Sequence, residues 1–264
     1  MNNLAATLAP SATALRKIAG IPIAVLTAYD YPGARLLEEA GIDWVLVGDS
    51  LGMVVLGYPD TTSVTLSDMV HHTAAVARGL SHTPLIADLP IGTYNTAEAA
   101  VKSARELLKA GAHAVKLEGG ISHCTQIAAL SAAGIPIMGH IGMLPQSVRE
   151  EGGYKIKGKT PEQGDALVAD ALAVEAAGAF SMVVELVHAD TARRIQTAVR
   201  IPTIGIGAGQ HCDGQVLVTH DLVGAFPWFR PKFVLPVASV GESIRTAVQQ
   251  WAAALKEGKV TKAE

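Results

Sequence analysis

The sequence predicts a (β/α)8 barrel, an α/β fold in which eight parallel strands alternate with helices and close on themselves. Apolar strand-like runs alternate with Ala-rich helical runs along most of the 264-residue chain. Several junctions between a helix and the next strand read Ala-Gly-Ala or Ala-Gly-Ile, and glycine is a usual helix stop. Four of the strand-like runs end in an acidic residue. A doubly wound open sheet is the alternative architecture.

The expected strands are short apolar runs, most of them rich in β-branched residues, as in strands that are buried on both faces. In chain order they cover residues 23–27, 44–48, 84–87, 114–117, 135–139, 180–184, 202–206 and 215–219. The second of these runs ends in Gly-Asp-Ser, where the chain must turn and can present a carboxylate.

The expected helices are Ala-rich runs, and several of them stop at a glycine such as Gly41, Gly111 or Gly178. In chain order they cover residues 11–19, 34–40, 66–79, 97–110, 126–133, 164–177, 189–199 and 243–256. Ser11 is the expected N-cap of the first helix. Because no linker interrupts the chain, we expect a single domain over residues 1–264, with a short N-terminal helix and a polar C-terminal tail that frays.

Composition excludes several classes of protein. The net charge of −3 and the absence of any Lys/Arg run argue against a nucleic-acid partner. The start of the chain lacks the basic residues of a signal peptide, and no apolar run reaches the ~18 residues that a membrane span needs. Cys124 and Cys212 form neither a disulfide framework nor a zinc motif. We therefore expect a cytoplasmic protein with reduced thiols and no membrane partner.

Nine segments carry a resemblance to a known family. In order they are Leu-Thr-Ala-Tyr-Asp (26–30), Val-Gly-Asp-Ser-Leu-Gly-Met (47–53), His-Thr-Ala-Ala-Val (72–76), Ala-Asp-Leu-Pro (87–90), Val-Lys-Leu-Glu-Gly-Gly (115–120), Gly-His-Ile-Gly (139–142), Pro-Gln-Ser-Val (145–148), Gly-Gly-Tyr-Lys (152–155) and Ile-Gly-Ile-Gly-Ala-Gly (204–209). Together they resemble the ketopantoate hydroxymethyltransferase family, from about residue 13 to residue 255. The chain departs from the family pattern at Met143-Leu144 and at residues 149–151, both in one loop.

The resemblance implies a barrel related to the phosphoenolpyruvate/pyruvate superfamily and a folate-dependent one-carbon transfer. The methylene group of 5,10-methylenetetrahydrofolate would be added to C3 of 3-methyl-2-oxobutanoate, giving 2-dehydropantoate in the first committed step of pantothenate and coenzyme A biosynthesis. The resemblance also implies one Mg²⁺ per subunit and a homodecamer of two stacked pentamers. The decamer does not follow from any pattern in the residues.

The resemblance assigns roles to the acids at the strand ends. Asp49, Asp88 and Glu118 would hold Mg²⁺, Glu118 partly through water, and Glu185 would be the general base that removes the C3 proton. Oxygen ligands from three strand ends suit a hard divalent cation, which stabilises negative charge on an enolised keto acid. Each acid alone could instead cap a helix or form a surface salt bridge.

The keto acid would be bound by Asp49, Ser50, Asp88, Lys116 and His140. Lys116 lies two residues before Glu118, so both side chains are expected on one face of their strand. A Schiff-base role is the alternative for a buried barrel lysine. For His140 the alternative is a core histidine whose hydrogen bonds are satisfied inside the protein.

Two other readings of the whole chain stay open. The chain could be another kind of metal-dependent enzyme, a carbon–carbon lyase or aldolase, which would share the metal site without needing folate. It could also be a non-catalytic protein that binds a metal or a keto acid and has kept the fold. The segment 152–158, which has glycines at both ends, could close over the barrel mouth or be an ordered surface loop. The glycines at 205–209 could cradle a phosphate or allow close backbone packing.

Overall fold

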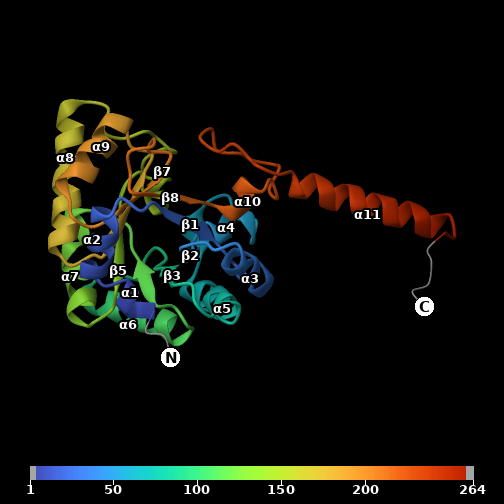
Figure 1. Ribbon diagram of the computed structural model, residues 1–264, viewed down its shortest axis with the longest axis horizontal. Helices are drawn as coiled ribbons and strands as arrows, with labels where there is room; N and C mark the ends of the chain where they lie inside the picture. The colour runs from blue at the N-terminus through green and yellow to red at the C-terminus, as the bar shows by residue number, and fades with distance from the viewer. Residues whose placement is uncertain (1–3, 260–264) are drawn as a thin grey trace. The chain divides into compact units, whose positions relative to one another are not determined.

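The computed structural model describes residues 4–259, and these form the closed barrel that the sequence predicts. Each strand lies beside the next one in sequence, and the pairs from β1–β2 to β7–β8 are parallel (Figure 1). The strands are β1 (Ile23–Thr27), β2 (Trp44–Val47), β3 (Leu85–Asp88), β4 (Ala114–Lys116), β5 (Ile137–Gly142), β6 (Ser181–Glu185), β7 (Thr203–Ile206) and β8 (Gly214–Leu217).

Helices connect most of these strands, and those before residue 217 lie around the outside of the barrel (Figure 1). The longer ones are α2 (Pro10–Ile18), α3 (Tyr31–Glu39), α5 (Leu66–Ala77), α6 (Ala97–Lys109), α7 (Cys124–Ala132), α8 (Pro161–Ala176), α9 (Ala189–Ala198) and α11 (Val240–Lys256). Short turns are α1 (Leu4–Thr7), α4 (Leu51–Val54), α10 (Thr219–Leu222) and the 3-10 helices η1 (Thr61–Ser63), η2 (Ile121–His123) and η3 (Pro145–Ser147).

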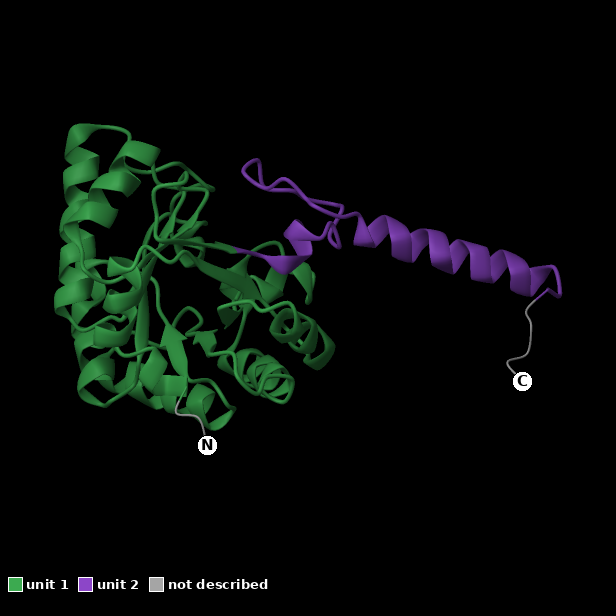
Figure 2. Ribbon diagram, viewed as in Figure 1, with its two compact units in different colours: residues 1–216 green, residues 217–264 purple. Residues whose placement is uncertain are grey.

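The chain divides between Val216 and Leu217 into two compact units (Figure 2). The first contains β1 to β7 and helices α1 to α9, and the second contains α10 and α11. The single domain expected over residues 1–264 stays a prediction. The tail that we expect to fray includes residues 260–264, which lie outside the described residues.

Two helix starts differ from the sequence prediction. Asp30 caps α3, its side chain accepting a hydrogen bond from the Gly33 amide (2.7 Å), so the helix begins three residues earlier than expected. Ser11 is not the cap of α2, because that helix begins at Pro10 and Ala9 occupies the cap position without a side-chain hydrogen bond. The expectation for Ser11 was therefore wrong.

The alternation of side chains along each strand positions the functional residues. A small apolar cluster includes Ile86, Ala114, Met138 and Val183, one each from β3 to β6, together with Phe180 at the start of β6. In each of these strands the residue two positions further on points to the same face of the sheet. These next residues are all polar and chemically active: Asp88, Lys116, His140 and Glu185. The fold thus places one ring of functional groups above an apolar layer.

Candidate active site

The residues predicted from the strand ends gather at one end of the barrel. Asp88, Lys116, His140 and Glu185 lie in or at the ends of β3 to β6, Asp49 follows β2, and Glu118 follows β4. Asp49, Asp88, Lys116, Glu118 and His140 are all buried, each with at most 4% of its surface exposed. Charged residues are almost never this deeply buried unless they are paired. Their pairing therefore decides what the site can do.

Lys116 is held between acidic side chains. Its Nζ lies 2.9 Å from Asp88 Oδ1 and 4.0 Å from Glu118 Oε1. Burial opposes the charged amine, but the carboxylates of Asp88, Glu118 and Asp49 outweigh it and raise the pKa of Lys116. A permanently charged lysine is a poor nucleophile, so this geometry disfavours the Schiff-base alternative.

His140 connects two carboxylates that have different proposed roles. Its Nδ1 lies 3.5 Å from Glu118 Oε1, and its Nε2 lies 3.3 Å from Glu185 Oε2. Burial and Lys116 disfavour a charged imidazole, yet Glu118 and Glu185 outweigh them and raise the pKa of His140 to about 9. His140 is therefore paired within the site through both ring nitrogens.

Negative charge accumulates on Asp49 and Asp88. Burial, followed by the charges of Asp88 and Glu118, raises the pKa of Asp49 well above its usual range. Burial also raises the pKa of Asp88, although Lys116 opposes the rise. The Asp49 amide donates a hydrogen bond to Asp88 Oδ2 (3.0 Å), which brings the two acids together. An additional positive charge at this point would relieve the repulsion.

The fold and this arrangement of charged groups can now be compared with known proteins. The family model for ketopantoate hydroxymethyltransferase matches residues 11–262, which is most of the chain. The chain belongs to this family. The membership expected from nine short segments is confirmed, and so is the enzyme class that it carries.

Curated relatives of this hydroxymethyltransferase family cover nearly the whole chain. The 3-methyl-2-oxobutanoate hydroxymethyltransferase of Heliobacterium modesticaldum is 50% identical over 241 residues, covering 90% of this chain and 87% of its own. The enzyme of the same name from Ignicoccus hospitalis is 50% identical over 241 residues and covers 91% of both chains. The enzyme of that name from Moorella thermoacetica is 48% identical over 242 residues, covering 91% of this chain and 90% of its own.

Solved structures outside the hydroxymethyltransferase family share its fold. Phosphoenolpyruvate phosphomutase from Streptomyces platensis subsp. rosaceus has a TM-score of 0.62 and 17% identity, covering 93% of this chain and 88% of its own. 2,3-Dimethylmalate lyase, of the PEP mutase/isocitrate lyase superfamily, has a TM-score of 0.62 and 18% identity, covering 98% of this chain and 89% of its own. Phosphonopyruvate hydrolase, solved with oxalate and Mg²⁺, has a TM-score of 0.62 and 17% identity, covering 93% of this chain and 87% of its own. At these identities the likeness shows the fold alone, and it confirms the predicted fold class.

Gln146 is the main residue of the candidate site that the sequence did not predict. It is buried, and it contacts Asp49, Glu118 and the hydroxyl of Tyr94. Burial, with the nearby charges of Glu118 and Asp49, raises the pKa of Tyr94, so its hydroxyl stays a donor. The Pro-Gln-Ser motif was noticed as a family segment, but nothing in its sequence indicates which acids the glutamine reaches.

Ser50 occupies the edge of the site. Its Oγ lies 2.8 Å from the hydroxyl of Tyr29, and Nδ1 of His72 lies 2.6 Å from the Tyr29 carbonyl oxygen. His72 thus has a partner within the fold. The substrate role of Ser50 stays a prediction.

The chain turns sharply after the proposed base. Leu186 has φ of 47°, in the left-handed region that costs a side-chain-bearing residue roughly 1–2 kcal/mol. Its amide donates to the Ile206 carbonyl (2.9 Å), and its carbonyl accepts from the Lys157 amide (2.8 Å). These bonds hold the strained turn, so the backbone next to Glu185 is fixed by both a neighbouring strand and a loop.

The loop over residues 152–158, which could act as a lid, is held by contacts on either side. Arg149 forms an ion pair with Asp60 (Nε to Oδ2, 2.7 Å), and the Lys157 carbonyl accepts from the His188 amide (2.9 Å). Between these contacts, burial and the charges of Glu185 and Asp49 raise the pKa of Tyr154. The phenol therefore lies within the electrostatic reach of the site. Closure of residues 152–158 stays a prediction.

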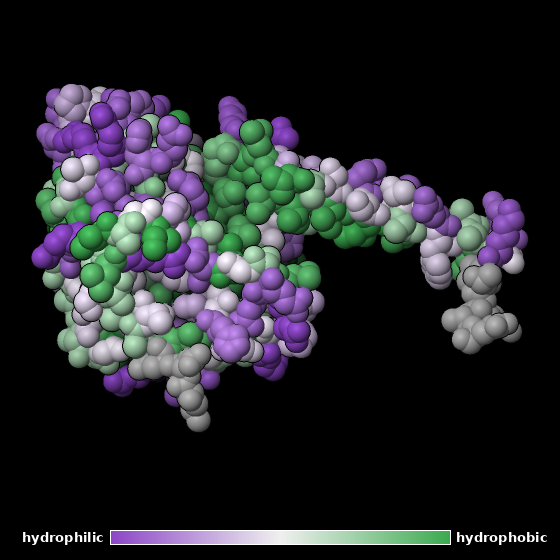
Figure 3. Space-filling view, viewed as in Figure 1, coloured by the Kyte–Doolittle hydropathy of each residue, from purple (hydrophilic) through white to green (hydrophobic). Residues whose placement is uncertain are grey.

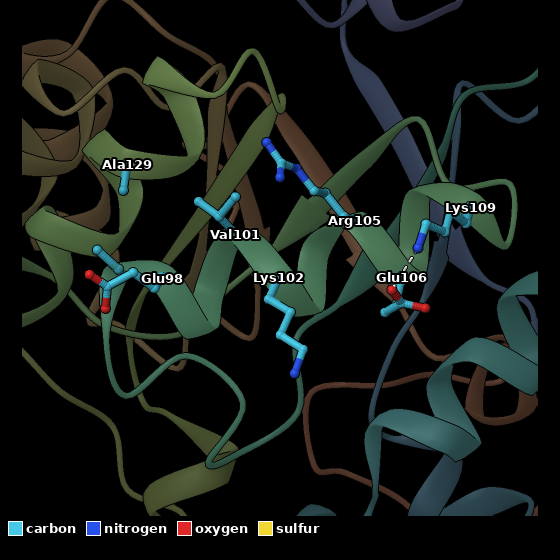
Figure 4. Close-up of a pocket in the computed structure, with 8 residues that line it drawn as sticks. Glu98, Val101, Lys102, Arg105, Glu106, Lys109 and Ala129 are labelled. Atoms are coloured by element: carbon cyan, nitrogen blue, oxygen red, sulfur yellow. Dashed lines mark hydrogen bonds and ion pairs between the residues drawn. The ribbon is translucent and has the colours of Figure 1, made fainter.

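Other features lie away from these acids. At Gly205 an added Cβ would lie 3.2 Å from Sγ of Cys212, which agrees with close packing. A surface hollow of about 440 Å³ is lined by one face of α6 and by Ala129 of α7 (Figure 4). Glu106 and Lys109 pair there, and none of the candidate site residues lines it.

The described part of the chain lacks two features. Residues 4–259 contain no group of three or more His, Cys, Asp or Glu side chains already placed to hold one metal ion. Within the same residues, every helix is too short or too polar to cross a membrane.

Proposed function

We propose that this protein transfers the one-carbon unit of 5,10-methylenetetrahydrofolate to C3 of 3-methyl-2-oxobutanoate, giving 2-dehydropantoate for pantothenate and coenzyme A synthesis. The observation that carries the proposal is the presence of two separate acidic functions at one barrel mouth. Asp49, Asp88 and Glu118 are buried together, whereas the Glu185 side chain keeps 12% of its surface exposed. Family membership supports this choice of substrates.

The donor set fits Mg²⁺. Asp49, Asp88 and Glu118 offer only carboxylate oxygens, which hard divalent cations prefer. Glu118 Oε1 is buried without a hydrogen-bond partner, and burial, together with the charges of Asp88 and Glu118, raises the pKa of Asp49, so a bound cation would favour its ionised form. When bound, Mg²⁺ would supply a Lewis acid for the negative charge that develops on the substrate oxygens.

A cation held by these three acids would displace the amine of Lys116. Lys116 now lies between Asp88 and Glu118. We therefore propose that Lys116 moves from these acids toward the carboxylate and keto oxygens of the substrate. Ser50 would add a hydrogen bond from the edge of the site.

Glu185 is the group best placed to accept the C3 proton. It lies at the end of β6, is partly exposed, and contacts Nε2 of His140 (3.3 Å). The imidazole lies beside the carboxylate, and 12% of the Glu185 side chain stays exposed. A positioned base of this kind contributes roughly 10²–10⁴ to the rate. His140 would contact the substrate from the same layer.

We also propose that the enzyme acts in the cytoplasm as a homo-oligomer, the decamer that the family resemblance implies. Cys124 and Cys212 are both free, as is usual in a reducing compartment. Association is supported by the apolar residues that residues 217–259 expose, which include Trp228, Leu235 and Trp251.

The deciding experiment is an assay for 2-dehydropantoate with and without methylenetetrahydrofolate, in the presence of Mg²⁺. The proposal expects product only when folate is present. Folate-independent cleavage of a keto acid would favour the lyase alternative instead. Saturable keto-acid binding without any turnover would favour a binding protein.

A further inference from the structure

Gln146 contacts the candidate site with its backbone and with its whole side chain. It lies in η3, directly after β5, and only 5% of its surface is exposed. Its amide N donates to Glu118 Oε2 (3.0 Å). Its Nε2 donates to Asp49 Oδ2 (2.8 Å) and to the Leu89 carbonyl (3.0 Å), and its Oε1 accepts from the Tyr94 hydroxyl (2.5 Å). Every polar group of the side chain therefore has a partner.

The partners fix which way the side-chain amide points. The Leu89 carbonyl can only accept a hydrogen bond. The carboxylate of Asp49 can likewise only accept when it is ionised. A flipped amide would place Oε1 against both acceptors and leave the Tyr94 hydroxyl facing an NH₂ group. The observed orientation satisfies all of these groups, so the amide has one favourable position.

One residue thereby holds two of the three proposed metal ligands. Glu118 is held through its Oε2 by the Gln146 backbone, and Asp49 through its Oδ2 by the Gln146 side chain. The second oxygen of each carboxylate takes no hydrogen bond from Gln146. In the case of Glu118, that oxygen is buried and has no hydrogen-bond partner, although Nδ1 of His140 lies 3.5 Å and Nζ of Lys116 lies 4.0 Å from it. Gln146 thus holds each acid through one oxygen and leaves the second oxygen to other partners.

Tyr94 contacts the side-chain amide of Gln146. Its hydroxyl bonds to Oε1, and its ring packs edge-on against His123 with 5.4 Å between the ring centroids. Tyr94 is itself buried, with 7% of its surface exposed. Rotation of the Gln146 amide would break this bond as well as the one to Asp49, so the two residues act as a pair.

We infer that Gln146, supported by Tyr94, is a positioning residue that sets the orientation of Asp49 and Glu118 for a divalent cation. The inference rests on the proposed function for the identity of the cation site. Hydrogen-bond partners of metal ligands affect metal affinity by roughly 10–100-fold, and a residue that orients two ligands belongs to this class.

The test measures Mg²⁺ and Mn²⁺ affinity by calorimetry on the full-length protein, independently of turnover. Gln146→Met keeps the length of the side chain and removes its hydrogen bonds. We expect cation affinity to fall roughly 10–100-fold and kcat to fall more than KM for the keto acid. Tyr94→Phe removes only the hydroxyl and should give a smaller loss of the same kind, of about 2–10-fold, by weakening the hold on the amide.

Gln126→Met is the matched control. Gln126 is also a buried glutamine, with 9% of its surface exposed, but it lies in α7 and its Nε2 donates to the Asn95 carbonyl (3.4 Å). We expect this variant to bind the cations as the wild type does. Equal losses in Gln126→Met and Gln146→Met would show a general packing effect and overturn the inference.

Two further measurements separate a folding defect from a loss of cation binding. Gln146→Met must unfold cooperatively on heating, and if it does not, Tyr94→Phe carries the test. Unchanged cation affinity in a folded Gln146→Met or, failing that, Tyr94→Phe would overturn the inference. Absence of 2-dehydropantoate synthesis by the wild type would contradict the proposed function but leave the measured effect on cation affinity intact.

Discussion

Most proteins bury apolar side chains and expose charged ones. The barrel mouth and the C-terminal unit depart from this pattern in opposite ways. At the mouth, Lys116 and its neighbouring acids are buried, although charged groups normally stay in water. In residues 217–259, apolar side chains are exposed, with 78% of the Trp228 surface and 82% of the Leu235 surface open to solvent. Green apolar residues are visible at the surface in the space-filling view (Figure 3).

The difference teaches what each region needs in order to be complete. Buried charges that repel one another are stabilised by a ligand of opposite charge, so we expect the mouth to bind a small molecule or ion. Exposed apolar surface is stabilised by another apolar surface, so we expect the C-terminal unit to bind a protein partner. Substitutions in the two regions should therefore affect different measurements.

The largest effect is expected at Glu185. Glu185→Gln keeps the shape of the side chain but cannot accept the C3 proton. We expect turnover, and exchange of the C3 hydrogen of 3-methyl-2-oxobutanoate with solvent deuterium, to fall by roughly 10²–10⁴. NMR of the keto acid in D₂O measures the exchange directly.

Binding measurements on the same variant separate two roles. Glu185→Gln should bind Mg²⁺ and keto acid nearly as the wild type does, because Glu185 is not among the proposed ligands. Loss of binding would make it a ligand instead of a base. Exchange at the wild-type rate would move the base to another group, with His140 next in line.

The second prediction contrasts two neighbouring acids. Asp49→Asn and Asp88→Asn should each weaken Mg²⁺ binding by roughly 10²-fold, at the upper end of the range for groups that tune a metal site. Their effects on folding should differ. Asp88 pairs with Lys116, so its loss leaves a buried amine less well compensated and should cost about 3 kcal/mol. Asp49→Asn removes a repelled charge and should leave the free energy of unfolding unchanged or higher.

Calorimetry measures the cation affinity of these variants, and urea unfolding measures their stability. Wild-type Mg²⁺ affinity in both would place the cation site elsewhere. Equal destabilisation of the two would contradict the different pairing of Asp49 and Asp88.

The third prediction addresses the C-terminal unit. Ile244, Val248, Trp251 and Leu255 recur at the spacing of one helical face in α11, and all are more than half exposed. Trp251→Glu should lower the molar mass measured by light scattering, while the circular dichroism of the barrel stays unchanged. Gln250→Glu adds the same charge at an exposed position on another side of α11 and should leave the mass unchanged. A monomeric wild type would refute the oligomer proposal.

The smallest effect is expected at Asp221, a buried acid in α10. Burial raises its pKa to about 6, above the ordinary value of 3.8. Between these two values the folded chain binds more protons than the unfolded chain, so stability falls as the pH rises from 4 to 6. Asp221→Asn should therefore match the wild type near pH 4 and be more stable by about 1 kcal/mol above pH 7.

Thermal unfolding of wild type and Asp221→Asn across this pH range tests the sign. A stability difference that does not depend on pH would contradict the assignment. Such a result would also weaken the comparison of the two regions, because it would mean that burial of this acid costs nothing.

Much of the fold could be predicted because the signals are local. The apolar runs located all eight strands within a few residues, and glycines marked several helix ends. β5 shows the limit of this approach. It begins after Pro136 and continues to Gly142, three residues beyond the expected end, because it pairs with β6 as far as Gly142 and Glu185. The length of a strand depends on its neighbour, which the sequence of that strand does not contain.

By itself the sequence determined the barrel, the family and the position of Asp88, Lys116, His140 and Glu185 at or near strand ends. The period of two along a strand fixes which side chains share a face, and it acts over a few residues. Only the tertiary structure decided the partners: Lys116 between Asp88 and Glu118, and Gln146 against Asp49, 97 residues away in the chain. Closure of the barrel and the path of its loops bring these groups within hydrogen-bonding distance, and no local pattern encodes that proximity.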